Sequence, residues 1–156
     1  MGFFAELIKP FRTPDVGLAV LQLRVKRLPR GKSCVIEVRN DQSFTELDLA
    51  IRRALGYSGW DHCSAFFSGV PWESRCVAEA YPDNRGPGQF KPVSTLPLLT
   101  ETGCGYVYDF GNNRLHTITL LDLLPVDPEK EYPSIVKKRR KSRSKDEKQR
   151  LTKTKN

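Results

Sequence analysis

Positive charge is concentrated at the carboxyl end of this 156-residue chain, and this restricts folding to the residues before it. Residues 137–156 contain 11 Lys and Arg but only 2 Asp and Glu, whereas the whole chain has 26 and 18. The first 136 residues therefore hold 15 basic and 16 acidic residues, a net charge of −1. Like charges repel and the tail has almost no apolar side chain to bury, so it cannot build a core. We expect a disordered basic tail over residues 137–156.

The 136 residues before the tail are enough for one domain with a buried core. Residues 1–17 are rich in Pro and Gly and predict a loose N-terminal arm, which leaves residues 18–136 for the domain. No apolar run approaches the roughly 20 residues of a membrane-spanning helix. The start of the chain also lacks the basic residues of a secretory signal. These features predict a cytoplasmic protein without membrane association.

Alternation of apolar and polar residues predicts two antiparallel hairpins. The first joins a strand over residues 18–28 to one over residues 34–38. The second joins residues 106–110 to residues 116–120, and residues 111–113, Gly-Asn-Asn, tolerate the positive φ angles of a tight turn. Other segments are expected to be strands over residues 63–68 and 73–78 and a long surface loop over residues 81–92.

One helix is predicted over residues 44–55. Ser43 and Glu46 have the spacing of a capping box, apolar residues recur at helical spacing, and Gly56 provides a left-handed stop. Together with the hairpins, this helix predicts an α+β fold in which a mostly antiparallel sheet packs against one main helix. The helix is expected to bury Leu47, Ile51 and Leu55 and to turn Arg52 and Arg53 to water.

Residues 106–116 read Tyr-Val-Tyr-Asp-Phe-Gly-Asn-Asn-Arg-Leu-His and resemble the plasmid pRiA4b ORF-3-like family. The hallmark of that family is a strand reading Tyr-x-Tyr-Asp-Phe-Gly-Asp, a turn, and a returning strand that opens with Trp and His. Residues 56–67 resemble its Gly-Trp-Asp-x-x-His segment, and residues 120–133 resemble its closing Leu-Pro and Tyr-Pro motifs. The similarity spans roughly residues 18–135. The residues that match the family motifs are Trp60, His62, Tyr106, Tyr108, Asp109, Phe110, Gly111 and His116.

The resemblance implies an α+β domain found on plasmids and mobile elements, whose members are often labelled transposon resolvases. This chain departs from the family pattern, because Asn112 replaces an acidic turn residue and Leu115 replaces Trp. A basic run over residues 137–141 also replaces the Cys-containing segment that is common after Tyr-Pro. Any metal role of those cysteines would be absent here.

An enzymatic role would have to use Asp109 and His116. If Asp109 lay across the hairpin from His116, the pair could orient a base, but the sequence offers no evident nucleophile. A recombinase needs a nucleophilic Ser or Tyr among several arginines, and no such set can be assembled from this sequence. The alternative is structural, with His116 and Phe110 in the core and Asp109 and Gly111 shaping the turn. We expect no catalytic activity and no cofactor.

The four cysteines are widely spaced, without a Cys-x-x-Cys pair. In the cytoplasm disulfides are rare, so buried reduced thiols are the expectation. A zinc site drawn from His62, Cys63, Cys76 and Cys104 is the alternative, but the close ligand pairs of such sites are missing. We therefore predict no metal site.

Basic tails neutralise phosphates and give nucleic-acid affinity without sequence readout. The sequence thus predicts a non-enzymatic accessory protein of a plasmid or mobile element that associates weakly with DNA or RNA. The alternative is a protein–protein interaction module with an incidental solubilising tail, whose contact surface exposed Trp60, Trp72 or Tyr81 would mark. The candidate nucleic-acid-binding residues are Lys137, Lys138, Arg139, Arg140, Lys141, Arg143 and Lys145.

Overall fold

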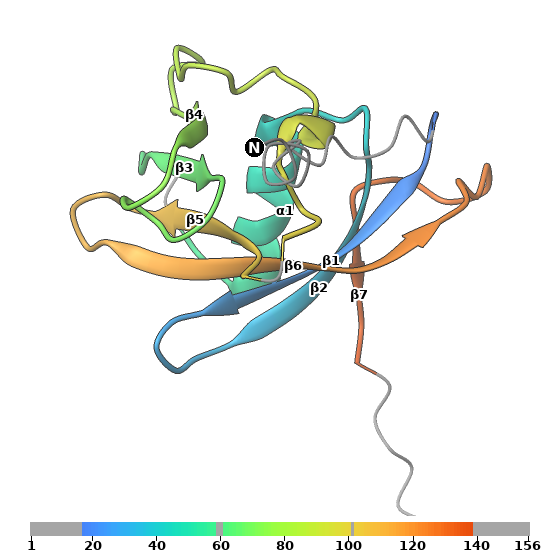
Figure 1. Cartoon of the computed structure of the whole chain (residues 1–156), viewed down its shortest axis with the longest axis horizontal. Helices are drawn as coiled ribbons and strands as arrows, with labels where there is room; N and C mark the ends of the chain where they lie inside the picture. Colours follow the sequence, from blue (N-terminus) through green and yellow to red (C-terminus); the bar gives the residue numbers. More distant parts are fainter. Residues whose placement is uncertain (1–16, 59–60, 101, 139–156) are drawn as a thin grey trace, which may run out of the picture.

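Seven antiparallel strands form one sheet, and the helix α1 covers one of its faces in the computed structural model (Figure 1). The structure describes residues 17–58, 61–100 and 102–138. It confirms the predicted α+β class, in which one main helix packs against an antiparallel sheet. The elements are β1 (Val20–Arg27), β2 (Ser33–Arg39), α1 (Phe44–Leu55), β3 (Ser64–Phe67), β4 (Cys76–Ala80), a 3₁₀ turn η1 (Val93–Thr95), β5 (Cys104–Tyr108), β6 (Arg114–Leu124) and β7 (Ser134–Val136).

The strand order β4-β3-β5-β6-β1-β2-β7 contains both predicted hairpins as adjacent pairs. β1 pairs with β2, and β5 pairs with β6, each antiparallel. The long strand β6 also pairs with β1 and so joins the two hairpins into one sheet. Local turn chemistry therefore builds the hairpins, and the 11-residue β6 unites them.

The helix has the predicted bounds and both predicted caps. The side chain of Ser43 accepts from the amide of Glu46, the Glu46 carboxylate accepts from the amide of Ser43, and Gly56 adopts a φ of 71°. The predicted stripe of Leu47, Ile51 and Leu55 is buried. Arg53 is exposed as predicted, but the prediction for Arg52 is wrong, because its side chain is buried among polar partners of β3 and α1.

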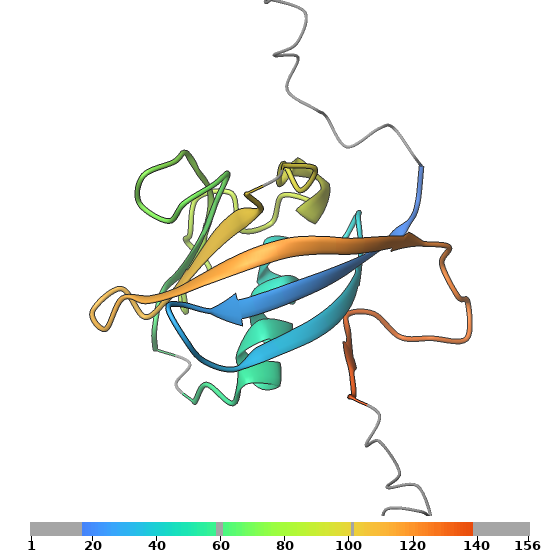
Figure 2. The same cartoon turned by 60° about the horizontal axis from the view of Figure 1, so that its bottom comes forward.

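Two apolar clusters lie on opposite faces of the sheet. The larger one fills the space between α1 and the sheet and includes Leu23 and Val25 of β1. The smaller one consists of Ala65, Phe67 and Val107, with Phe110 and Leu115 partly buried against it. Figure 2 shows α1 behind β1, β2 and β6, so the smaller cluster belongs to the face that the helix leaves uncovered.

Two strands differ from the sequence prediction. The strand expected over residues 73–78 begins only at Cys76, because residues 68–75 form a tight loop closed by the bond from the Ser68 amide to the Arg75 carbonyl. β7 has no counterpart in the prediction, and its three residues pair with β2 at the edge of the sheet. β7 depends on a partner that is distant in sequence, which alternation does not reveal.

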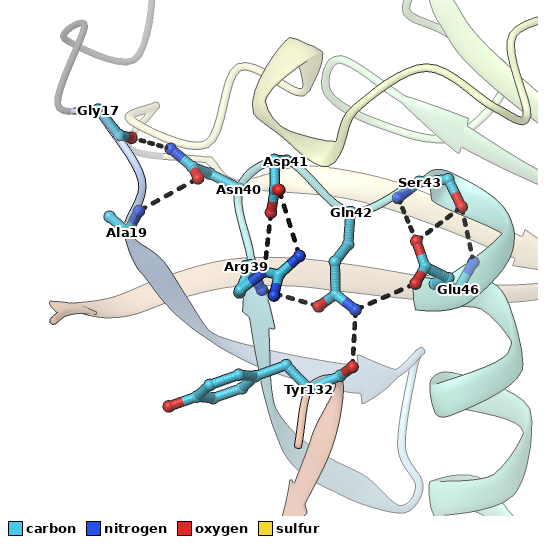
Figure 3. A network of polar contacts seen from close by, with 9 residues as sticks. All are labelled: Gly17, Ala19, Arg39, Asn40, Asp41, Gln42, Ser43, Glu46 and Tyr132. Carbon is cyan, nitrogen blue, oxygen red and sulfur yellow. Dashed lines mark hydrogen bonds and ion pairs between the residues drawn. The ribbon is translucent and has the colours of Figure 1, made fainter. Parts of the chain in front are cut away.

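A polar network in the turn between β2 and α1 binds the segments before β1 and before β7 (Figure 3). The Gln42 side-chain amide donates to Glu46 and to the carbonyl of Tyr132, and its oxygen accepts from the amide of Arg39. Asn40 holds the start of the described chain through Gly17 and Ala19. The turn that caps α1 therefore also positions the segment leading into β7 and the tail.

Candidate functional site

Tyr106 lies in a buried polar network between β5 and α1. Its hydroxyl donates to Asp48 at 2.6 Å and lies 3.2 Å from the hydroxyl of Ser64. Arg52 forms an ion pair with Asp48 at 2.8 Å and donates to Ser64 at 2.8 Å. Burial raises the pKa of Asp48 although Arg52 opposes that effect, and burial beside Asp48 holds the pKa of Tyr106 well above its usual value. The network satisfies charges that the fold has removed from water.

His116 is fully buried, as the core-residue interpretation predicted. Its Nε2 lies 2.5 Å from the Tyr57 hydroxyl, and its Nδ1 lies 3.3 Å from the carbonyl of Tyr106. Since a carbonyl only accepts, Nδ1 carries the proton and Nε2 accepts from Tyr57. Burial lowers the pKa of His116 to about 4, so the ring is neutral at physiological pH.

Asp109 stabilises the β5–β6 turn. Its carboxylate accepts from the backbone amide of Asn112 at 3.2 Å and from the Asn112 side chain at 2.6 Å. These hydrogen bonds, with the Asn112 side chain first, lower the pKa of Asp109. The positive φ angles of this turn belong to Asp109 and Asn113, so within the predicted segment 111–113 Asn113 adopts a positive φ and Gly111 does not.

The suggested pairing of Asp109 with His116 is wrong. The register places His116 opposite Tyr106, two residues before β5 ends at Tyr108. Asp109 follows that end and instead lies 3.6 Å from Nδ1 of His62. His62 packs edge-on against Tyr108, so this histidine joins the turn rather than a catalytic pair.

Sequence reasoning missed an aromatic and cationic stack at the end of α1. The rings of Tyr57 and Tyr108 are nearly parallel with centroids 4.5 Å apart, and the guanidinium of Arg114 lies over both. Arg52 lies 5.0 Å from the centre of Tyr108. The i,i+4 spacing of Asp48 and Arg52 was a usable signal for an ion pair. The contacts of Tyr57 and Arg114 form only when β5, β6 and the helix end come together.

Phe110 occupies the other side of the sheet. It is half-buried and packs edge-on against Trp72 at 5.3 Å, beside the smaller apolar cluster. The structure thus divides the predicted motif residues between two faces. Tyr106, Tyr108 and His116 face α1, whereas Phe110 joins the uncovered face.

The remaining predicted residues are only partly placed. Lys137 and Lys138 are exposed, whereas Trp60, Arg139, Arg140, Lys141, Arg143 and Lys145 lie outside the described residues.

The cysteines lie in different environments. Cys104 is buried and its thiol contacts the carbonyl of Pro97, whereas Cys76 is exposed, so buried thiols were not a correct expectation for all four. In the described parts of the chain, no three His, Cys, Asp or Glu side chains gather as metal ligands.

The sheet order, the single covering helix and the Tyr-x-Tyr-Asp-Phe-Gly hairpin define an α+β domain whose polar motif residues are held in its interior. Residues 35–148 match the family model of the plasmid pRiA4b ORF-3-like protein, and the chain belongs to this family.

A solved structure shares the fold. The crystal structure of a protein of unknown function, MM3350 from Methanosarcina mazei Go1, superposes with a TM-score of 0.58 at 22% sequence identity. The match covers 77% of this chain and 69% of the other. No curated protein matches the sequence. Over the described residues, no helix has the length and apolar character needed to cross a membrane.

Proposed function

We propose that the protein is a non-enzymatic accessory protein of a plasmid or mobile element that associates with nucleic acid through its basic tail. The excess of 11 basic over 2 acidic residues after Val136 is the observation that carries this proposal. Such a segment binds phosphates by releasing counterions, without reading bases. Lys137 and Lys138 begin it in exposed positions directly after β7. The other tail residues enter the proposal from the sequence alone.

The environment of the motif residues supports a role without catalysis. His116 uses both ring nitrogens in contacts with Tyr57 and Tyr106. Asp109 uses both carboxylate oxygens to hold Asn112. A general base must reach a proton on the substrate, and these groups are already engaged by the fold.

The test is fluorescence anisotropy with labelled duplex DNA and with labelled RNA over a salt series. The full chain is compared with a tail-neutral chain, in which nine basic residues are changed to Gln so that the tail keeps two basic and two acidic residues. The nine are Lys137, Lys138, Arg139, Arg140, Lys141, Arg143, Lys145, Lys148 and Arg150. A third chain has the residues of its tail in scrambled order. We expect the scrambled tail to bind like the original, because charge and not sequence supplies the affinity. The tail-neutral chain should bind more weakly, with a log–log salt slope on duplex DNA that is smaller by up to about 8 units, or about 0.9 for each phosphate contact. Equal binding by the tail-neutral and original chains would refute the proposal.

A second candidate, a protein–protein interaction module, is favoured by one observation. Val70 and Trp72 are 54% and 51% exposed on the loop between β3 and β4. Of the other predicted markers, Tyr81 is half-buried with its hydroxyl bonded to Glu79. This candidate is preferred if two conditions hold. The full chain does not bind nucleic acid at moderate salt, and it binds a protein that the Trp72→Leu variant does not bind.

A further inference from the structure

The β1–β2 hairpin is a basic surface within an almost neutral domain. Residues 23–36 contain five Lys and Arg and no Asp or Glu. All five side chains are exposed, and in the described parts of the chain none of them forms an ion pair. Uncompensated positive charge of this density attracts a polyanion. The residues are Arg24, Lys26, Arg27, Arg30 and Lys32.

Two of these residues lie on the face of the sheet opposite α1. Leu23 and Val25 are buried towards the helix, so the alternation of β1 turns Arg24 and Lys26 the other way. Hydroxyl side chains neighbour them in the register. Thr119 of β6 is opposite Arg24, whereas Lys26 lies between Thr117 of β6 and Ser33 of β2. Arg, Lys, Ser and Thr side chains are the usual contacts to phosphate oxygens.

The same face carries an exposed aromatic side chain. The register continues from Lys26 through Thr117 and Gly105 to Phe67, which Trp72 contacts edge-on at 5.0 Å. Three strand spacings of about 4.8 Å place Phe67 about 14 Å from Lys26.

Trp72 is held firmly in this exposed position. Its indole N–H donates to Asn113 at 2.6 Å, and its ring also packs against Phe110. Its φ of 66° is unusual for a bulky residue, and such strain is maintained where the surrounding contacts enforce it. The residue nevertheless keeps half of its surface exposed to water. An ordered, exposed aromatic ring is a platform on which a base can stack.

We propose that the sheet face opposite α1 binds single-stranded nucleic acid, with Arg24 and Lys26 on its phosphates and Trp72 stacked on a base. An acidic protein would satisfy the charges but would not need a flat aromatic ring beside them. A duplex would satisfy the basic residues but keeps its bases paired, out of reach of Trp72. This inference shares its ligand class with the proposed function but rests on a different site.

The experiment is done in the tail-neutral full-length chain, so that the tail does not mask the folded surface. The probes are fluorescein-labelled 20-nucleotide oligothymidylate and oligouridylate, together with a 20-base-pair duplex. The test variants are R24Q/K26Q and Trp72→Leu. The matched control is R53Q/K91Q, which removes two exposed positive charges outside the proposed surface. Thermal unfolding establishes that each variant is folded, and Trp72→Met replaces the leucine variant if that one unfolds. Trp72→Phe, which keeps an aromatic ring, is the conservative variant.

We expect R24Q/K26Q to weaken single-strand binding and to reduce the log–log salt slope by about 1.4 units, from two phosphate contacts at 0.7 each. Trp72→Leu should weaken binding by about fivefold or more and leave the salt slope unchanged, because base stacking releases no counterions. Trp72→Phe should retain most of the affinity. The control should change affinity less than R24Q/K26Q, and the duplex should bind more weakly than either single strand.

Three results would overturn the inference. The first is that R24Q/K26Q binds like R53Q/K91Q, so that the hairpin contributes only general positive charge. The second is that the duplex binds as tightly as the single strands and Trp72→Leu does not change binding. The third is that polyglutamate displaces the oligonucleotides as efficiently as unlabelled oligothymidylate of equal charge, which would assign the surface to an acidic protein. The tail proposal is decided separately, by the difference between the original and tail-neutral chains.

Discussion

Loss of the Arg52 side chain should lower the free energy of unfolding strongly. Arg52→Met keeps the aliphatic part but leaves the Asp48 carboxylate buried without its cation. Breaking a buried pair in this way destabilises a protein by about 3–5 kcal/mol. Arg53→Met is the control, because Arg53 is its exposed neighbour in α1 and should change stability by no more than about 0.5 kcal/mol. Urea unfolding measures both, and similar losses for the two variants would contradict a structural role for the pair.

His116 should make the stability of the protein depend on pH. Its pKa falls from 6.5 to about 4 on folding, chiefly through burial. The folded state therefore binds fewer protons, so the contribution of His116 is complete above pH 6.5 and is lost as the pH falls towards 4. The loss amounts to about 3 kcal/mol.

Urea unfolding at pH 7.5, 6, 5 and 4.5 tests this dependence, with His116→Gln as the comparison. Other groups contribute as well, including Asp48, whose raised pKa acts in the opposite direction. The difference between wild type and variant isolates the histidine. A difference that does not shrink as the pH falls from 6.5 towards 4 would show that His116 is not buried in its neutral form.

Among the loops, the one over residues 68–75 is fixed by close approach to β5. A Cβ on Gly105 would lie 2.5 Å from the Gly69 carbonyl oxygen and 2.7 Å from the ring of Pro71. Gly105→Ala should therefore push this loop away, at a cost of about 1–3 kcal/mol, and disturb Trp72. Gly111→Ala is the control, since its Cβ would meet Asp109 only at 3.4 Å. The readouts are the thermal midpoint and the indole N–H resonance of Trp72, and an unchanged resonance in Gly105→Ala would show that the loop does not depend on this contact.

The elements that sequence reasoning predicted well are those whose determinants are local. Ser43, Glu46 and Gly56 fix both ends of α1 within the helix itself. The two hairpins follow from alternation and short turns. β7 was missed because its pairing partner β2 is remote in sequence. β4 was misplaced because the loop over residues 68–75 takes up the first part of the predicted strand.

In the candidate site, too, local features were predicted and contacts between distant elements were not. Tyr106, Tyr108 and His116 were identified as motif residues, but their partners were not. Ser64 and Tyr57 reach them from other elements, so the pattern of one strand could not reveal them. The basic surface of the β1–β2 hairpin was hidden for a different reason, since the acidic residues elsewhere in the domain cancel it in the net charge.

At the scale of the whole molecule, Gln42 joins parts of the chain that are 90 residues apart. Its side chain is buried and links Arg39 at the end of β2, Glu46 in α1 and the carbonyl of Tyr132 before β7 (Figure 3). β7 has only three residues and pairs on one side, so its position should depend on this anchor.

Gln42→Ala should therefore have two effects. It leaves part-buried backbone groups without their partner, which costs about 1–3 kcal/mol of stability. It also frees the segment before β7, so the amides of residues 134–136 should exchange with solvent faster than those of β1. Asp41→Ala is the control, because Asp41 makes only an exposed pair with Arg39, of little value to stability. Hydrogen exchange followed by NMR measures the exchange rates of these amides in both variants. If β7 stays as protected in Gln42→Ala as in Asp41→Ala, strand pairing alone holds the edge of the sheet, and the basic tail is anchored independently of the helix cap.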